Sequence, residues 1–162
     1  SRQKKNFKNY SDLGSDIPVC LYGKNSLVLG IGEKIFQHKF PKYFFLVVKP
    51  EISFSTKQMY KKLNIKQEKN TKNDQEHQKV IYDEDWRNDF EKIATKEDKQ
   101  LNQLLQFLSK SQGCLFSRMT GSGSGCFATY NNEDYAIGAQ SSLKEEFPKL
   151  WSFVGENNAV KD

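Results

Sequence analysis

The sequence predicts an α+β fold in which helices cover one face of a mostly antiparallel sheet. Three observations support this prediction: an apolar strand signal near residue 45, a leucine-rich helical pattern in the middle of the chain, and two short β-type runs joined by a glycine loop. With 162 residues, 36% hydrophobic residues and 12 Phe, the chain has the size of one or two small domains and enough apolar surface to build a core.

The first forty residues contain a helix signal and a hairpin signal. Ser15 and Asp16 stand just before Pro18, an order typical of a capped first helical turn, and Gly23 would end that helix. Residues 26–40 combine Leu and β-branched residues with glycines, which predicts a short hairpin.

The clearest strand signal is the apolar run at residues 43–49, which lies between two prolines. An uninterrupted apolar run is typical of a strand buried on both faces. Ser55 and Gln58 then have the spacing of a capping box, which predicts a helix of about two turns through Leu63. Residues 64–79 contain a single apolar residue and are expected to form a solvated loop.

Apolar residues at helical spacing predict two further helices, over residues 89–94 and 97–111, with a break near Thr95 to Glu97. The remaining predicted elements are two strands, a helix and a last strand, over residues 115–119, 126–130, 133–147 and 150–154. After residue 40 the expected order is therefore a strand, three helices, two strands, a helix and a strand.

Charge and cysteine content exclude several classes of protein. The net charge is +5, but the lysines are interleaved with acidic residues and form no stripe with exposed aromatics, which argues against an RNA-binding surface.

The longest apolar run has six residues, far fewer than the roughly 20 of a membrane-spanning helix. The basic N-terminus is not followed by the apolar segment of a secretory signal. The opening residues, which lack an initiator Met, are those expected of a processed chain or a fragment.

The three cysteines are an odd number without C-x-x-C spacing, and only two histidines accompany them. This content argues against a disulfide framework or a metal site, so we expect no metal ligands among these residues. The cysteines are instead expected to be buried, reduced thiols of a cytosolic protein.

Three features could carry chemistry, and each also has a purely structural interpretation. Residues 120–125 (TGSGSG) could bring backbone N–H groups and hydroxyls close to a phosphate, or form a flexible hairpin turn. Asp16 could be a general base in phosphoryl transfer, or only a helix N-cap. Tyr60 could stack on a base, or be a core residue of an amphipathic helix. Spacing alone leaves these alternatives open.

Four segments together resemble the GHMP small-molecule kinases. Residues 118–128 resemble the glycine-rich third motif of this family, and residues 13–19 resemble its catalytic-aspartate segment. Residues 30–33 and 88–91 match further signatures in the same order. In detail, the chain resembles the members that act on cytidine diphosphate methylerythritol in non-mevalonate isoprenoid synthesis.

The resemblance implies an ATP- and Mg²⁺-dependent kinase in which residues 1–39 end the N-terminal domain and residues 40–162 form the C-terminal domain. It also implies that Asp16 is the general base and that Ile31 and Tyr60 pack on the cytosine ring. The remaining implied substrate contacts are Thr56 and Lys57 beside the cytidine, and the loop residues Gly121, Ser122 and Gly123 over the phosphate site. Lys57 replaces a proline common at that position.

The family's main ATP-phosphate loop and its catalytic lysine would both precede residue 1. The resemblance therefore implies the C-terminal portion of a kinase, nearly inactive without the missing N-terminal half, in a bacterial-type cytosol or a plastid. Two alternatives stay open: a GHMP kinase acting on homoserine or mevalonate, and a non-catalytic α+β binding module for a ligand such as RNA.

Overall fold

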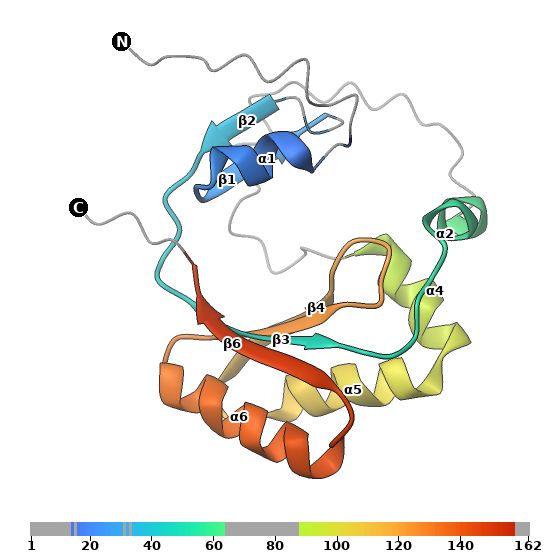
Figure 1. Cartoon of the computed structure of the whole chain (residues 1–162), viewed down its shortest axis with the longest axis vertical. Helices are drawn as coiled ribbons and strands as arrows, with labels where there is room; N and C mark the ends of the chain where they lie inside the picture. Colours follow the sequence, from blue (N-terminus) through green and yellow to red (C-terminus); the bar gives the residue numbers. More distant parts are fainter. Residues whose placement is uncertain (1–13, 15, 31, 33, 64–87, 158–162) are drawn as a thin grey trace. The chain divides into compact units, whose positions relative to one another are not determined.

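The computed structural model describes residues 14, 16–30, 32, 34–63 and 88–157 of the chain (Figure 1). The expected loop at residues 64–79 and the candidate residue Ile31 lie outside the described residues. The chain divides into two compact units, one formed by Ser1–Tyr43 with Glu156–Asp162, and the other by Phe44–Gly155. Among the described residues, every helix is too short or too polar to span a lipid bilayer.

The first unit contains a short helix and a hairpin. Helix α1 (Ile17–Tyr22) ends at Gly23, whose left-handed backbone (φ 63°) lets its N–H donate to the carbonyl of Val19. Strands β1 (Ser26–Leu29) and β2 (Lys34–Gln37) pair antiparallel. The predicted helix and hairpin are therefore both confirmed.

Within the described residues, the second unit has the predicted order of elements. It begins with β3 (Phe44–Lys49), and the helices described after it are α2 (Thr56–Leu63), α4 (Asp89–Glu97) and α5 (Lys99–Lys110). The remaining elements are β4 (Cys114–Met119), β5 (Cys126–Tyr130), α6 (Glu133–Glu146) and β6 (Trp151–Glu156). The strands form one sheet in the order β4-β5-β3-β6, so β5 and β3 are central and β4 is an edge strand. This is the split β-α-β arrangement, with α5 and α6 on one face of the sheet (Figure 1).

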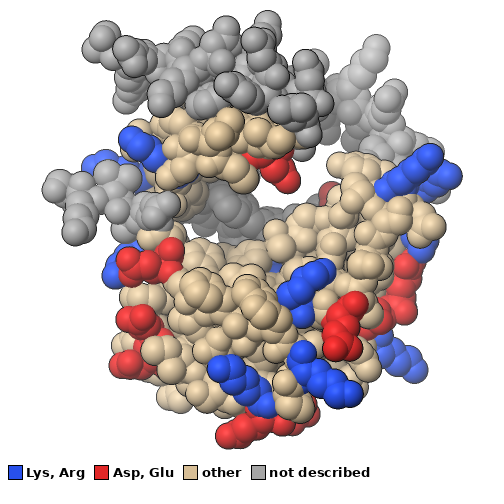
Figure 2. Space-filling view, in the orientation of Figure 1, with Lys and Arg blue, Asp and Glu red and all other residues tan. Residues whose placement is uncertain are grey.

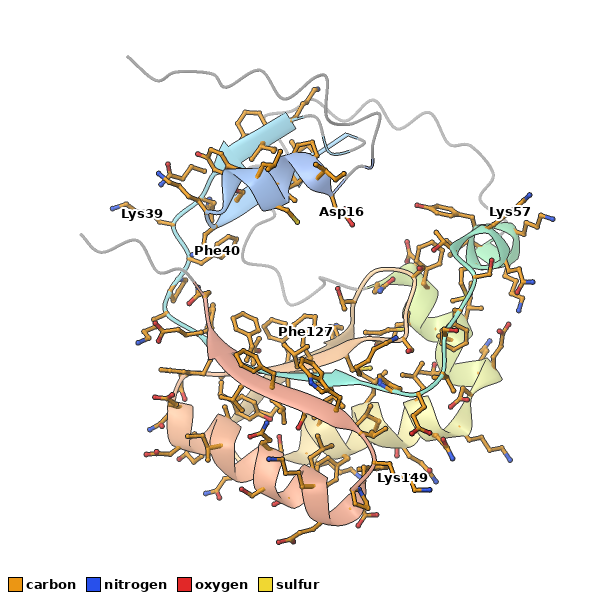
Figure 3. All side chains as sticks on the ribbon, in the orientation of Figure 1. Asp16, Lys39, Phe40, Lys57, Phe127 and Lys149 are labelled. Atoms are coloured by element: carbon orange, nitrogen blue, oxygen red, sulfur yellow. The ribbon has the colours of Figure 1, made fainter. Side chains whose placement is uncertain are left out.

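The core lies between the sheet and the helices α5 and α6. Alternate residues of the central strands are buried there, and α5 contributes four leucines at helical spacing: Leu101, Leu104, Leu105 and Leu108. On β3, Leu46 and Val48 are fully buried, whereas Phe45 and Val47 point to the opposite face and stay partly exposed. The expectation that this strand is buried on both faces is therefore wrong, since Phe45 and Val47 are only partly buried on the face opposite the described helix α6. Phe127 of β5 lies on the same less buried face (Figure 3).

The boundary between α4 and α5 lies at Asp98, not at residues 95–97 as predicted. The Asp98 N–H donates to the carbonyl of Ala94, ending α4, and its carboxylate accepts from the N–H of Leu101 at 2.8 Å, starting α5. Thr95 lies within α4, where its hydroxyl donates to the carbonyl of Glu91 at 2.8 Å. One aspartate thus serves as the cap of both helices.

Candidate substrate-binding site

The glycine-rich segment forms a tight loop between β4 and β5. The N–H of Thr120 donates to the carbonyl of Gly125 at 2.8 Å, and the N–H of Gly123 donates to the carbonyl of Thr120 at 3.1 Å. Gly121 (φ 57°) and Gly123 (φ 93°) both adopt left-handed backbone conformations that side chains disfavour. The loop is therefore an internally bonded turn.

The two left-handed glycines have different surroundings. A Cβ atom on Gly123 would come within 2.8 Å of Met119 Sδ and of Phe54 Cδ2, so the loop packs closely on the unit's interior there. A Cβ atom on Gly121 would meet no atom within 4 Å among the described residues. Among the described residues, the Gly121 side of the loop is therefore the more open of the two.

The two serines of the loop have opposite roles. Ser124 is fully buried, and its hydroxyl donates to the carbonyl of Ile52 and accepts from Lys49 Nζ at 3.2 Å. Ser122 lies nearer the surface, where its hydroxyl is 2.8 Å from the hydroxyl of Thr56 at the start of α2. The structure thus brings Thr56 and Ser122, two residues predicted for the site, into direct contact.

Helix α2 presents the other predicted residues of this region at the surface. Lys57 and Tyr60 are exposed, and Figure 3 shows Lys57 extending from α2. The Tyr60 side chain is 58% exposed, and its ring meets the edge of Phe90 at 5.0 Å between centroids and an interplanar angle of 88°. The core interpretation of Tyr60 is therefore wrong, because Met59 is the residue of this helix that enters the core.

Residues 88–91, for which the sequence predicted no contact role, hold the glycine loop where it leaves β4. Asn88 Nδ2 donates to the carbonyls of Met119 at 2.9 Å and Gly121 at 2.7 Å, while Asn88 Oδ1 accepts from the N–H of Phe90 at 3.0 Å. Glu91 Oε2 accepts from the N–H of Met119 at 2.6 Å. An asparagine before an acidic helical turn is a recognisable N-cap signal, but nothing in the sequence indicates its contacts with the loop.

Asp16 belongs to the first unit, whereas the glycine loop belongs to the second. It occupies the N-cap position of α1, but its carboxylate makes no capping hydrogen bond and the residue is exposed (Figure 3). Helix capping therefore does not explain why position 16 is an aspartate.

The cysteines differ in burial from what the sequence predicts. Cys126 is fully buried and Cys114 is half-buried, but Cys20, in the short helix α1, is exposed. Burial, with a smaller contribution from the charge of Glu91, raises the pKa of the Cys126 thiol to about 12. The described part of the chain contains no group of three His, Cys, Asp or Glu residues that could hold a metal ion.

A family model and a solved structure show which kinases the chain resembles. Residues 71–149 match the family model described as GHMP kinases C terminal. The crystal structure of a 4-(cytidine 5'-diphospho)-2C-methyl-D-erythritol kinase superposes with a TM-score of 0.71 over 96% of this chain and 58% of that one, at 19% identity. The second unit thus has the fold of the C-terminal domain of GHMP kinases, which confirms the fold predicted from the resemblance.

Curated relatives show which members of that family the chain resembles. The chain is 36% identical over 131 residues to the 4-diphosphocytidyl-2-C-methyl-D-erythritol kinase of Buchnera aphidicola, covering 81% of this chain and 42% of that protein. It is 29% identical over 148 residues to the enzyme of the same name from Anaplasma phagocytophilum, covering 87% and 49%. The chain is therefore similar to the C-terminal region of 4-diphosphocytidyl-2-C-methyl-D-erythritol kinases, and it spans about half the length of the curated relatives it matches.

Proposed function

We propose that this chain is the C-terminal part of an ATP-dependent kinase that phosphorylates the 2-hydroxyl of 4-diphosphocytidyl-2-C-methyl-D-erythritol, a step of non-mevalonate isoprenoid synthesis in the cytoplasm. Residues 1–39 would end the N-terminal domain and residues 40–162 would form the C-terminal domain. The observation that supports the proposal most is the 2.8 Å contact between Thr56 and Ser122, which joins α2 to the glycine loop. A ligand with a pyrimidine at one end and phosphates at the other requires two such surfaces side by side.

On the α2 side, the cytidine would lie against Thr56, Lys57 and Tyr60. The exposed Tyr60 ring, supported edge-on by Phe90, has the character of a stacking surface for a base. Thr56 offers a hydroxyl, and Lys57 a cation beside the diphosphate. Ile31 would contribute an apolar contact to the same ring.

On the loop side, Gly121, Ser122 and Gly123 would close over the phosphates. The open space at Gly121 permits close backbone approach, and the loop is already fixed by its own hydrogen bonds. Magnesium would be bound together with ATP through the phosphate oxygens of the nucleotide. Asp16, whose exposed carboxylate makes no capping hydrogen bond, would accept the proton of the attacking hydroxyl.

A kinase assay with a panel of acceptors tests the proposal. The chain joined to an upstream GHMP half should transfer phosphate from ATP to 4-diphosphocytidyl-2-C-methyl-D-erythritol, while the chain alone should show little turnover. Phosphorylation of homoserine or mevalonate instead would assign the chain to another GHMP kinase. RNA binding that weakens steeply with salt, without any phosphoryl transfer, would favour a non-catalytic module. On the face shown in Figure 2, the Lys, Arg, Asp and Glu side chains of the second unit are interspersed.

A further inference from the structure

The oxygen and the amino group of the Asn88 side-chain amide are both hydrogen-bonded. Its single carbonyl oxygen accepts from the N–H of Phe90, and its amino group donates to two backbone carbonyls, those of Met119 and Gly121. Of the side chains of this size, only an asparagine amide offers one acceptor and two donors in this arrangement. An aspartate could cap the helix equally well but would set a carboxylate against two carbonyl oxygens.

Glu91 extends the same support by one helical turn. Its carboxylate accepts from the N–H of Met119, whose carbonyl accepts from Asn88. Met119 is the last residue of the edge strand β4, and in an antiparallel strand the N–H and C=O of one residue point to the same side. The start of α4 therefore binds the outer edge of β4 where the glycine loop begins.

The bond from Asn88 to Gly121 fixes the orientation of one peptide plane. In a trans peptide the C=O and the following N–H point in opposite directions, so holding the Gly121 carbonyl on Asn88 directs the N–H of Ser122 away from Asn88. Within the described residues, the N–H of Ser122 donates to no acceptor, and Gly121 beside it faces open space. An oriented N–H donor in a glycine loop is the kind of group that binds a phosphate oxygen.

We propose that Asn88 is a positioning residue that holds the Gly121–Ser122 peptide so that the Ser122 N–H binds a phosphate oxygen of the substrate. Phosphate binding by the Ser122 N–H rests on the proposed function. The positioning of the loop by Asn88 does not, because it follows from hydrogen bonds within the second unit alone.

Asn88→Asp separates the two roles of the amide, since it keeps the helix cap and removes both donors to the loop. Asn132→Asp is the matched control, because Asn132 caps α6 by accepting from the N–H of Asp134 at 2.7 Å and lies outside the loop. In two-dimensional NMR spectra of this chain, Asn88→Asp should shift the amide signals of Gly121 and Ser122, whereas Asn132→Asp should leave them in place. Asn88→Ser provides a second variant without the added charge, in case Asn88→Asp fails to fold.

In the chain joined to an upstream GHMP half, Asn88→Asp should raise KM for 4-diphosphocytidyl-2-C-methyl-D-erythritol about tenfold, with a smaller change in kcat and none in Asn132→Asp. Unchanged loop signals in both Asn88 variants would overturn the positioning role. Shifted signals with an unchanged KM would overturn the phosphate contact. If the unsubstituted protein neither binds nor phosphorylates this substrate while the loop signals shift, the proposed function is wrong and the loop support stands.

Discussion

Substitution of Gly123 tests how closely the glycine loop packs on the interior of the second unit. Its backbone is left-handed (φ 93°), which costs a residue with a Cβ about 1–2 kcal/mol. The added methyl of Gly123→Ala would also lie 2.8 Å from Met119 Sδ and from Phe54 Cδ2, and Met119 is buried in the core, so its side chain has little room to move. Overpacking of this kind costs about 1–3 kcal/mol more. We therefore expect Gly123→Ala to lower the free energy of unfolding by about 3 kcal/mol.

Gly121→Ala is the matched control, since it has the same backbone strain without the steric contact. Gly121 is left-handed (φ 57°), but its Cβ would meet no described atom within 4 Å, so the expected loss is about 1–2 kcal/mol. Urea unfolding followed by far-ultraviolet circular dichroism measures both variants. Equal losses in the two variants, or a Gly123→Ala loss below about 1 kcal/mol, would refute the close packing of the loop on Met119 and Phe54.

Three further predictions concern the proposed chemistry and the core. Asp16→Asn, in the chain joined to an upstream half, should lower kcat about 1,000-fold with little change in KM, and retained turnover in a steady-state assay would exclude the proposed base. Tyr60→Ala should weaken binding of the cytidine substrate about tenfold in calorimetry while Tyr60→Phe leaves it near the original value; equal losses would argue against stacking. Cys126 has a pKa raised from 9.0 to about 12 in the folded state, so the unfolded chain releases this proton first and stability should fall as pH rises above 9, by up to about 1.4 kcal/mol per pH unit. Urea unfolding under reducing conditions between pH 8 and 10 should show a smaller slope for Cys126→Ala, and an identical slope would contradict the assignment.

Periodicity in the sequence was enough to predict the described elements of the second unit. The apolar run at residues 43–49 indicated a strand and the four leucines of α5 indicated an amphipathic helix, and both elements form where expected. The boundary between α4 and α5 lies at Asp98 and not at the predicted residues 95–97, because the capping ability of Asp98 outweighs the weak helix propensity of Thr95. The burial of β3 was overestimated because an apolar run does not reveal how many faces have a partner.

The candidate site was predictable in its residue types but not in its contacts. Glycines and hydroxyls indicated a loop that a ligand can approach, but the sequence does not distinguish Ser122, which meets Thr56, from Ser124, which is buried against Ile52. That difference depends on the backbone path of the loop. The contact of Asn88 with Gly121 joins segments 33 residues apart and likewise depends on tertiary packing.

The central claim is that α2 and the glycine loop form one site for a cytidine diphosphate ligand. Titration of the isotope-labelled chain with 4-diphosphocytidyl-2-C-methyl-D-erythritol, followed by two-dimensional NMR, tests it most directly. We expect the amide signals of Thr56, Tyr60, Gly121 and Ser122 to shift together with a single dissociation constant, and those of Asn132 on α6 to stay in place. Shifts confined to one of the two segments, or no shifts at saturating ligand, would contradict the claim.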